Sequence, residues 1–146
     1  MKFTFVTLFP NLIEPYFYDS ILKRAIEANF ISYEFYNPRD FTTNKHKKVD
    51  DQMVGSGAGM LLLCQPLFDC LNEIKSKDSD AYIIFPLAAA KPFRQNDAKR
   101  LAKKENIVFV SGRSNSDYTI DDFSFSKIER SYDVVPADSS KYIRIN

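Results

Sequence analysis

The chain has 146 residues, 45% of them hydrophobic and 27% charged, a composition typical of one soluble globular domain with its own core. No stretch approaches a membrane span, and the first residues lack the apolar region of a signal peptide, so we expect a cytoplasmic protein without a membrane partner. The net charge of +1 neither favours nor excludes a polyanionic partner, and the two cysteines, Cys64 and Cys70, fit no zinc pattern and no disulfide scaffold.

The first 36 residues predict a strand, a helix and a second strand. Residues 2–8 are rich in aromatic and β-branched side chains, which is typical of a buried strand. Apolar residues recur at helical spacing over 11–28, and Asp19-Ser20 can cap a second segment within that range. Residues 30–36 alternate loosely and predict the second strand.

A long polar stretch precedes the next regular elements. Residues 37–60 hold many charges and three of the four glycines, and a segment of this kind in a compact domain is usually functional or disordered. Helical spacing returns over 61–76, and a strand is predicted over 81–87. A helix over 94–104 and a buried strand over 106–111 follow.

This order predicts an α/β fold with a largely parallel sheet and flanking helices. Ligands of such sheets bind beyond the carboxyl ends of the strands, so the segments after residues 87 and 111 are the first places to look for a site.

The character of the chain changes after Gly112. Residues 114–146 contain seven serines and no glycine, and they carry four Lys or Arg against six Asp or Glu. Residues 1–113 carry 16 basic against 13 acidic residues. We therefore predict a domain over 1–113 and a divergent tail over 114–146, in which Phe123–Phe125 and Tyr142–Ile145 are apolar enough for edge strands.

Two features of the polar stretch are candidates for chemistry. In Gly55-Ser56-Gly57-Ala58-Gly59-Met60 the alternate glycines either let backbone N–H groups approach a ligand closely or form a flexible linker. His46 lies close in sequence to Asp50 and Asp51. These residues either supply a general base or belong to an exposed polar loop. There are too few ligands nearby for a metal, so we expect no metal site.

Two strand ends are also candidates. The strand near residue 85 runs into Leu87-Ala88-Ala89-Ala90, small residues before a helix, which either offer backbone groups to a ligand or form an ordinary turn. The last strand ends at Ser111-Gly112-Arg113, where the glycine lets the chain turn sharply.

Taken together and in order, these segments resemble one family, the bacterial tRNA (guanine-N1)-methyltransferases of the SPOUT class. The motifs of that family appear here as Thr7-Leu8-Phe9-Pro10, the run NPRDFTTNKHKKVDD over 37–51, the loop GSGAGM over 55–60 and Gly112-Arg113. The resemblance covers residues 1 to about 113, where we expect it to end.

The resemblance implies transfer of a methyl group from S-adenosylmethionine to N1 of the guanine just 3′ to a tRNA anticodon. It also implies a homodimer with a trefoil-knotted fold and the active site at the dimer interface. By position, the cofactor-binding residues are Leu87, Ala88, Ala89, Ala90, Gly112 and Arg113. By position, the substrate-binding residues are His46, Asp50, Gly55, Gly57, Gly59 and Met60.

The chain departs from the family pattern after Arg113. Ser114-Asn115-Ser116 stands where the family has Tyr-Glu-Gly, and the glycine-free tail predicts an incomplete knot. The family's Asp base and Arg lie beyond this point, so the catalytic residues here are unknown; Asp121, Asp122 and Arg130 match no motif. The family's C-terminal tRNA-binding domain is not matched either. Three hypotheses stay open: a rearranged methyltransferase, a non-catalytic nucleotide- or RNA-binding module, and a dimerisation partner of a complete relative.

Overall fold

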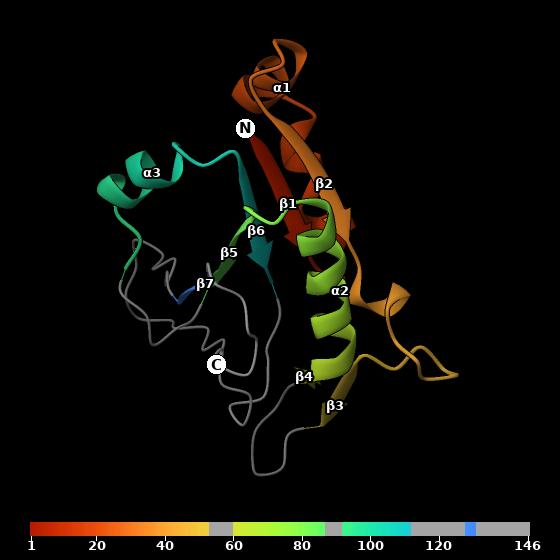
Figure 1. The fold of residues 1–146 in the computed structure, drawn as a ribbon. Coiled ribbons are helices and arrows are strands. Elements are labelled where there is room, and N and C mark those ends of the chain that lie inside the picture. Colours follow the sequence, from red (N-terminus) through yellow and green to blue (C-terminus); the bar gives the residue numbers. More distant parts are fainter. Residues whose placement is uncertain (53–59, 87–91, 112–127, 131–146) are drawn as a thin grey trace.

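The computed structural model describes residues 1–52, 60–86, 92–111 and 128–130 and contains a five-stranded sheet (Figure 1). The strands run in the order β2-β1-β6-β5-β7, and every pairing between neighbours in this sheet is parallel. Their bounds are β1 (Lys2–Val6), β2 (Ser32–Tyr36), β5 (Tyr82–Phe85), β6 (Asn106–Val110) and β7 (Ile128–Arg130). The prediction of an α/β fold with a largely parallel sheet is confirmed.

The remaining described elements are helices, 3₁₀ turns and a small hairpin. They are α1 (Ser20–Glu27), α2 (Cys64–Lys77), α3 (Gln95–Leu101), the 3₁₀ turns η1 (Pro10–Leu12), η2 (Glu14–Phe17) and η3 (Pro38–Asp40), and the antiparallel pair β3 (Asp50–Gln52) and β4 (Met60–Leu62). None of the helices in the described ranges is long and apolar enough to cross a bilayer.

The predicted helix over 11–28 is wrong in its first half. Two 3₁₀ turns, each with a proline in its first two positions, precede an α-helix of only eight residues. Proline lacks the N–H that an α-helix interior needs, which explains the break at Pro15. The cap at Asp19-Ser20 is confirmed, because the Asp19 carboxylate accepts a hydrogen bond of 2.7 Å from the Ser20 N–H.

Two other predictions need correction. The stretch 37–60, predicted without regular structure, contains a 3₁₀ turn, the strand β3 and the first residue of β4. The helix predicted from residue 61 begins at Cys64, because residues 60–62 pair with 50–52 as strands.

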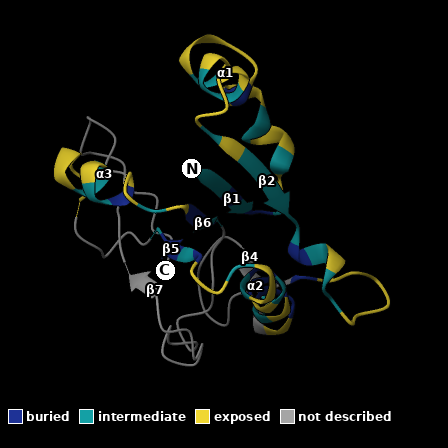
Figure 2. Ribbon diagram, turned by 45° about the horizontal axis from the view of Figure 1, so that its top comes forward, coloured by how far each residue is buried: buried dark blue, intermediate teal, exposed yellow. Residues whose placement is uncertain are grey.

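The core lies in two layers, one on each face of the sheet. Strand residues alternate between faces: Ile83 and Val108 pack in the cluster with Leu71 of α2, whereas Ile84 and Ile107 pack with Leu101 of α3. The two helices therefore lie on opposite faces. Figure 2 shows α2 and α3 apart from each other, with buried strand segments between them.

Aromatic rings cover the face opposite α2. Phe5 stacks on Phe35 and on Phe109 with centroids 5.5 and 5.7 Å apart, and Phe17 of η2 stacks on Tyr33 at 4.2 Å. The segment between β1 and β2 is thus held to the sheet by ring contacts through Phe17, which is 7% exposed.

Cys70 lies fully buried in the α2 cluster as a free thiol. Burial raises the pKa of the Cys70 thiol to about 12, and the negative charges of Asp40 and Glu73 act in the same direction. A thiol that stays protonated is a poor nucleophile, so Cys70 acts as a small buried apolar side chain.

The tail contributes one described strand to the sheet. β7 pairs with β5, with Phe85 opposite Arg130, and forms the edge of the five-stranded sheet. An edge strand in the tail was expected, but at other positions. Phe123–Phe125 and Tyr142–Ile145 lie outside the described residues.

Candidate functional site

The carboxyl ends of the strands form one continuous edge, termed the carboxyl edge here. The Thr7 N–H donates to the Tyr36 carbonyl at 3.0 Å, and the Ser111 N–H donates to the Val6 carbonyl at 2.9 Å. The parallel register pairs the last residues of β1, β2 and β6 with one another, and β5 ends at the same level. In Figure 1 these arrowheads lie towards β3 and β4, whereas α1 lies at the opposite end.

Four segments that take part in the resemblance described above leave this edge. Residues 7–10 follow β1, residues 37–40 follow β2, residues 86–90 follow β5 and residues 111–113 follow β6. They lie far apart in the sequence, yet a parallel sheet brings their starting points together. The edge is therefore the place where this fold is able to hold a ligand.

The segment after β2 turns at once. The Asn37 side chain accepts a hydrogen bond of 3.0 Å from the Arg39 N–H, and Pro38 is buried. The rings of Tyr36 and Phe41 lie 6.4 Å apart and pack against the α2 cluster. These contacts fix where the following polar residues begin.

Residues 42–48, termed the basic turn, form a loop closed by its own hydrogen bonds. The Thr42 hydroxyl donates to the Lys48 carbonyl at 2.8 Å, and the Asn44 side chain accepts from the His46 N–H at 2.8 Å. Lys47 has a φ of 52°, in the left-handed region. Lys45, His46 and Lys47 are exposed, so the turn presents positive charge to solvent.

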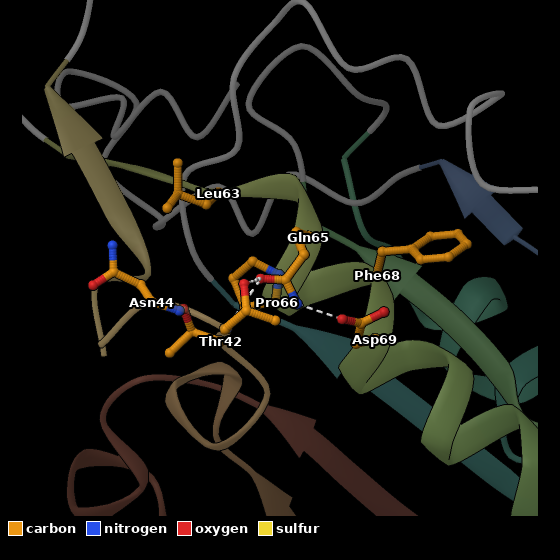
Figure 3. A pocket seen from close by; sticks show the side chains of 8 residues that line it. Thr42, Asn44, Leu63, Gln65, Pro66, Phe68 and Asp69 are labelled. Carbon is orange, nitrogen blue, oxygen red and sulfur yellow. Dashed lines mark hydrogen bonds between the residues drawn. The ribbon is translucent and has the colours of Figure 1, made fainter. Parts of the chain in front are cut away.

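A cavity of about 630 Å³ lies between the basic turn and the start of α2 (Figure 3). It is lined by Thr42, Thr43, Asn44, Leu63, Gln65, Pro66, Phe68 and Asp69. Gln65 holds the walls together: its amide donates to the Phe41 carbonyl at 2.8 Å and to the Asp69 carboxylate. Its Oε1 accepts from the N–H and hydroxyl of Thr43 at 3.4 Å.

Asp50 and Met60, two of the predicted substrate-binding residues, stand on the paired strands β3 and β4. Asp50 pairs with Leu62 and Gln52 pairs with Met60. Val49, immediately before β3, is fully buried, and its carbonyl accepts from the Leu63 N–H at 2.7 Å. The hairpin therefore joins the basic turn to the start of α2.

The other predicted site residues are only partly placed by the structure. His46 is exposed in the basic turn, close in sequence to the hairpin. Nine predicted residues lie outside the described residues: Gly55, Gly57, Gly59, Leu87, Ala88, Ala89, Ala90, Gly112 and Arg113. The segments that carry the last six adjoin Phe85 and Val110, the terminal residues of the neighbouring strands β5 and β6.

No sequence motif pointed to Gln65 and Asp69, which line the cavity. Gln65 contacts residues 22 to 24 positions earlier in the chain, and no motif links them. Within the described part of the chain, no group of three His, Cys, Asp or Glu side chains could hold a metal ion.

The fold is that of an α/β protein with a parallel sheet, a class in which ligands commonly bind beyond the carboxyl ends of the strands. The sequence profile of the family described as tRNA (Guanine-1)-methyltransferase TrmD matches residues 1–127, and the chain belongs to this family. The family profile extends to residue 127, whereas the alignments with individual relatives cover 113 residues, the length over which we expected the resemblance.

Similar proteins carry the same name, tRNA (guanine-N(1)-)-methyltransferase. The chain is 65% identical to one from a Sulfurovum species over 113 residues, which are 77% of this chain and 50% of that protein. It is 60% identical to one from Sulfurimonas denitrificans and 61% identical to one from Campylobacter curvus, again over 77% of this chain and over 49% and 48% of the relatives. The chain therefore spans about half the length of the curated relatives it matches.

Proposed function

We propose that the chain takes part in S-adenosylmethionine-dependent methylation of guanine N1, at the guanine just 3′ to the anticodon of tRNA, in the cytoplasm. The observation that supports this proposal is the common origin, at the carboxyl edge, of the segments that correspond to the family's cofactor and substrate loops. The names of the relatives supply the reaction and the tRNA substrate.

The proposal assigns separate tasks to the segments of the edge. Backbone groups of residues 87–90 and 112–113 would hold the cofactor, whose sulfonium centre supplies an electrophilic methyl group. His46, Asp50, the loop 55–59 and Met60 would contact the tRNA. N1 of guanine carries a proton, so the reaction also needs a base, and no described side chain is assigned to that task.

Calorimetric titration of the whole chain with S-adenosylmethionine tests the proposal. We expect binding in the micromolar range, followed by methyl transfer to a tRNA transcript. Asp121→Ala, Asp122→Ala and Arg130→Ala variants then show whether the tail supplies catalytic groups. Absence of binding by a chain that circular dichroism shows to be folded would leave one of the two alternatives, the RNA-binding module or the partner of a complete relative.

We further propose that the chain forms a homodimer through residues 9–30, termed the arm. The arm exposes six large apolar side chains, each 57–74% accessible: Phe9, Leu12, Tyr16, Tyr18, Ile21 and Phe30. Figure 2 shows most of α1 as exposed. Four of the six are aromatic, and one aromatic side chain buries roughly 150–250 Å². Together with Leu12 and Ile21, these four approach the roughly 800 Å² that each partner gives to a stable interface.

The charges of the arm favour a second copy over a polyanion. The arm holds three acidic residues, Glu14, Asp19 and Glu27, against two basic ones, Lys23 and Arg24. A surface with both signs is able to complement itself across a two-fold axis. The arm therefore presents no net positive charge that would attract RNA.

Sedimentation analysis of a Tyr16→Glu/Ile21→Glu variant tests the arm. We expect a dimer for the unchanged chain and a dissociation constant raised at least roughly 100-fold for the variant, because two charges would be buried unpaired. Ala102→Glu, which places the same charge at an exposed site after α3, is the matched control and should leave the dimer intact. A variant that sediments like the unchanged dimer would refute the role of the arm.

A further inference from the structure

We propose that the cavity between the basic turn and α2 binds a guanine nucleotide of single-stranded RNA, with the Asp69 carboxylate reading the base and the basic turn attracting the phosphates. The inference rests on the proposed function in one respect, namely that the chain acts on RNA. It adds a base-specific contact outside the segments that the family resemblance assigns to cofactor and substrate.

The cavity has the size and lining of a site for a small organic group. Its volume of about 630 Å³ lies within the range of roughly 300–1,000 Å³ that is usual for ligand pockets. Leu63 and Phe68, both partly exposed, give it an apolar surface on which a flat base can lie, and a few polar groups stand beside them. Figure 3 shows Gln65 between the residues of the basic turn and Asp69.

The polar wall has one anionic acceptor held in a defined place. Gln65 is fixed by its bonds to Phe41 and Thr43, and its amide in turn holds the Oδ2 atom of Asp69. Within the part of the chain that the structure describes, no donor is recorded for Oδ1 of Asp69. A carboxylate accepts about four hydrogen bonds, so Asp69 retains the capacity to accept two more from a ligand.

A carboxylate selects guanine among the RNA bases by its pattern of donors. Guanine presents two adjacent donors, N1–H and the N2 amino group, on the Watson–Crick edge that single-stranded RNA leaves open. Adenine places the acceptor N1 beside its amino group, so an acceptor would face the carboxylate. Cytosine has the same mismatch at N3. Two parallel hydrogen bonds to an ionised acceptor are the stronger arrangement.

The charges around the cavity also fit a nucleotide. Lys45 and Lys47 are exposed on the turn whose residues Thr42, Thr43 and Asn44 line the cavity. An acidic wall repels phosphate, whereas a basic rim attracts it. The base would therefore enter the cavity and the phosphates would stay outside, near the turn.

Fluorescence anisotropy with two labelled RNAs of about twelve nucleotides tests the inference. One contains a single central guanine, and the other carries inosine there, which keeps N1–H but lacks the N2 amino group. We expect the unchanged chain to bind the guanine RNA about tenfold more tightly than the inosine RNA, in line with the loss of one of two paired hydrogen bonds.

The Asp69→Asn variant gives the decisive comparison. It should weaken binding of the guanine RNA about tenfold and remove the preference over inosine. Glu73→Gln, one turn further along α2, is the matched control, because it also removes one negative charge. Removing a negative charge should by itself strengthen binding to RNA, so a loss of affinity specific to Asp69→Asn identifies a direct contact.

The basic turn is tested by a Lys45→Ala/Lys47→Ala variant. It should weaken binding of both RNAs equally and reduce the dependence of affinity on salt, because phosphate contacts carry no base information. Equal affinity of the unchanged chain for both RNAs would overturn the inference while leaving the proposed methylation in place. Conversely, a preference for the guanine RNA without methyl transfer would support the role of the cavity and contradict the proposed methylation. A chain that binds neither RNA would contradict both the role of the cavity and the proposed methylation.

Discussion

Replacing Leu71 by alanine should lower the free energy of unfolding by about 3 kcal/mol, because a buried leucine that is cut to alanine loses its transfer energy and leaves a cavity. Leu71 is fully buried at the centre of the cluster that joins α2 to the sheet. For a chain of this size the loss corresponds to a fall of about 10 °C in Tm. Urea and thermal unfolding followed by circular dichroism would measure both quantities.

Leu12→Ala is the matched control for this prediction. Leu12 is 71% exposed, so the same truncation at low protein concentration should change stability by less than about 0.5 kcal/mol. If Leu71→Ala lowered the free energy of unfolding no more than Leu12→Ala does, Leu71 would not be packed between α2 and the sheet. The start of α2, and with it the cavity beside Gln65, would then be misplaced as well.

The strands were predictable because both faces of this sheet are covered. In β6, four of the five residues are buried, which gives the continuous apolar run typical of a parallel sheet. The arm has apolar residues at helical spacing too, but Leu12 and Ile21 are 71% and 74% exposed. Apolar residues at helical spacing usually form a buried helix face, but in the arm they form an exposed surface. Only Pro15 indicated that the helix predicted over 11–28 would break.

The hairpin and the cavity could not be predicted for a different reason. Strands of three residues, such as β3 and β4, are too short for alternation to be recognised. The cavity depends on Gln65, which contacts Phe41 and Thr43 through tertiary contacts that no local pattern encodes. The carboxyl edge, by contrast, followed from the order of elements alone, since parallel strands always align their carboxyl ends.

A buried polar network holds the strands of that edge in register. The Thr4 hydroxyl lies 3.1 Å from both the Glu34 carboxylate and the Asn106 side-chain oxygen, and it can donate its single proton to either acceptor, one on each strand beside β1. Lys2 pairs with Glu34 at 2.6 Å, and the Asn106 amide donates to Asp78 at 2.9 Å. Thr4 is fully buried and Asn106 is 5% exposed, so water cannot replace these bonds.

Thr4→Val should therefore destabilise the chain by about 2 kcal/mol, although it preserves the shape of the side chain. Valine removes the donor and leaves the buried Asn106 oxygen without it, whereas Glu34 keeps its pairing with Lys2. Thr43→Val, at an exposed position, should cost less than about 0.5 kcal/mol. Urea unfolding of both variants measures the difference.

A double-mutant cycle identifies the cause of that loss. In an Asn106→Ala background the oxygen that Thr4→Val would leave unpaired no longer exists, so Thr4→Val should cost clearly less there than in the unchanged chain. Equal costs in the two backgrounds would show that the Thr4 hydroxyl does not act through Asn106. A loss confirmed by the cycle would mean that the register of β1 and β6, and hence the position of the segments leaving the carboxyl edge, depends on a hydroxyl in the middle of β1.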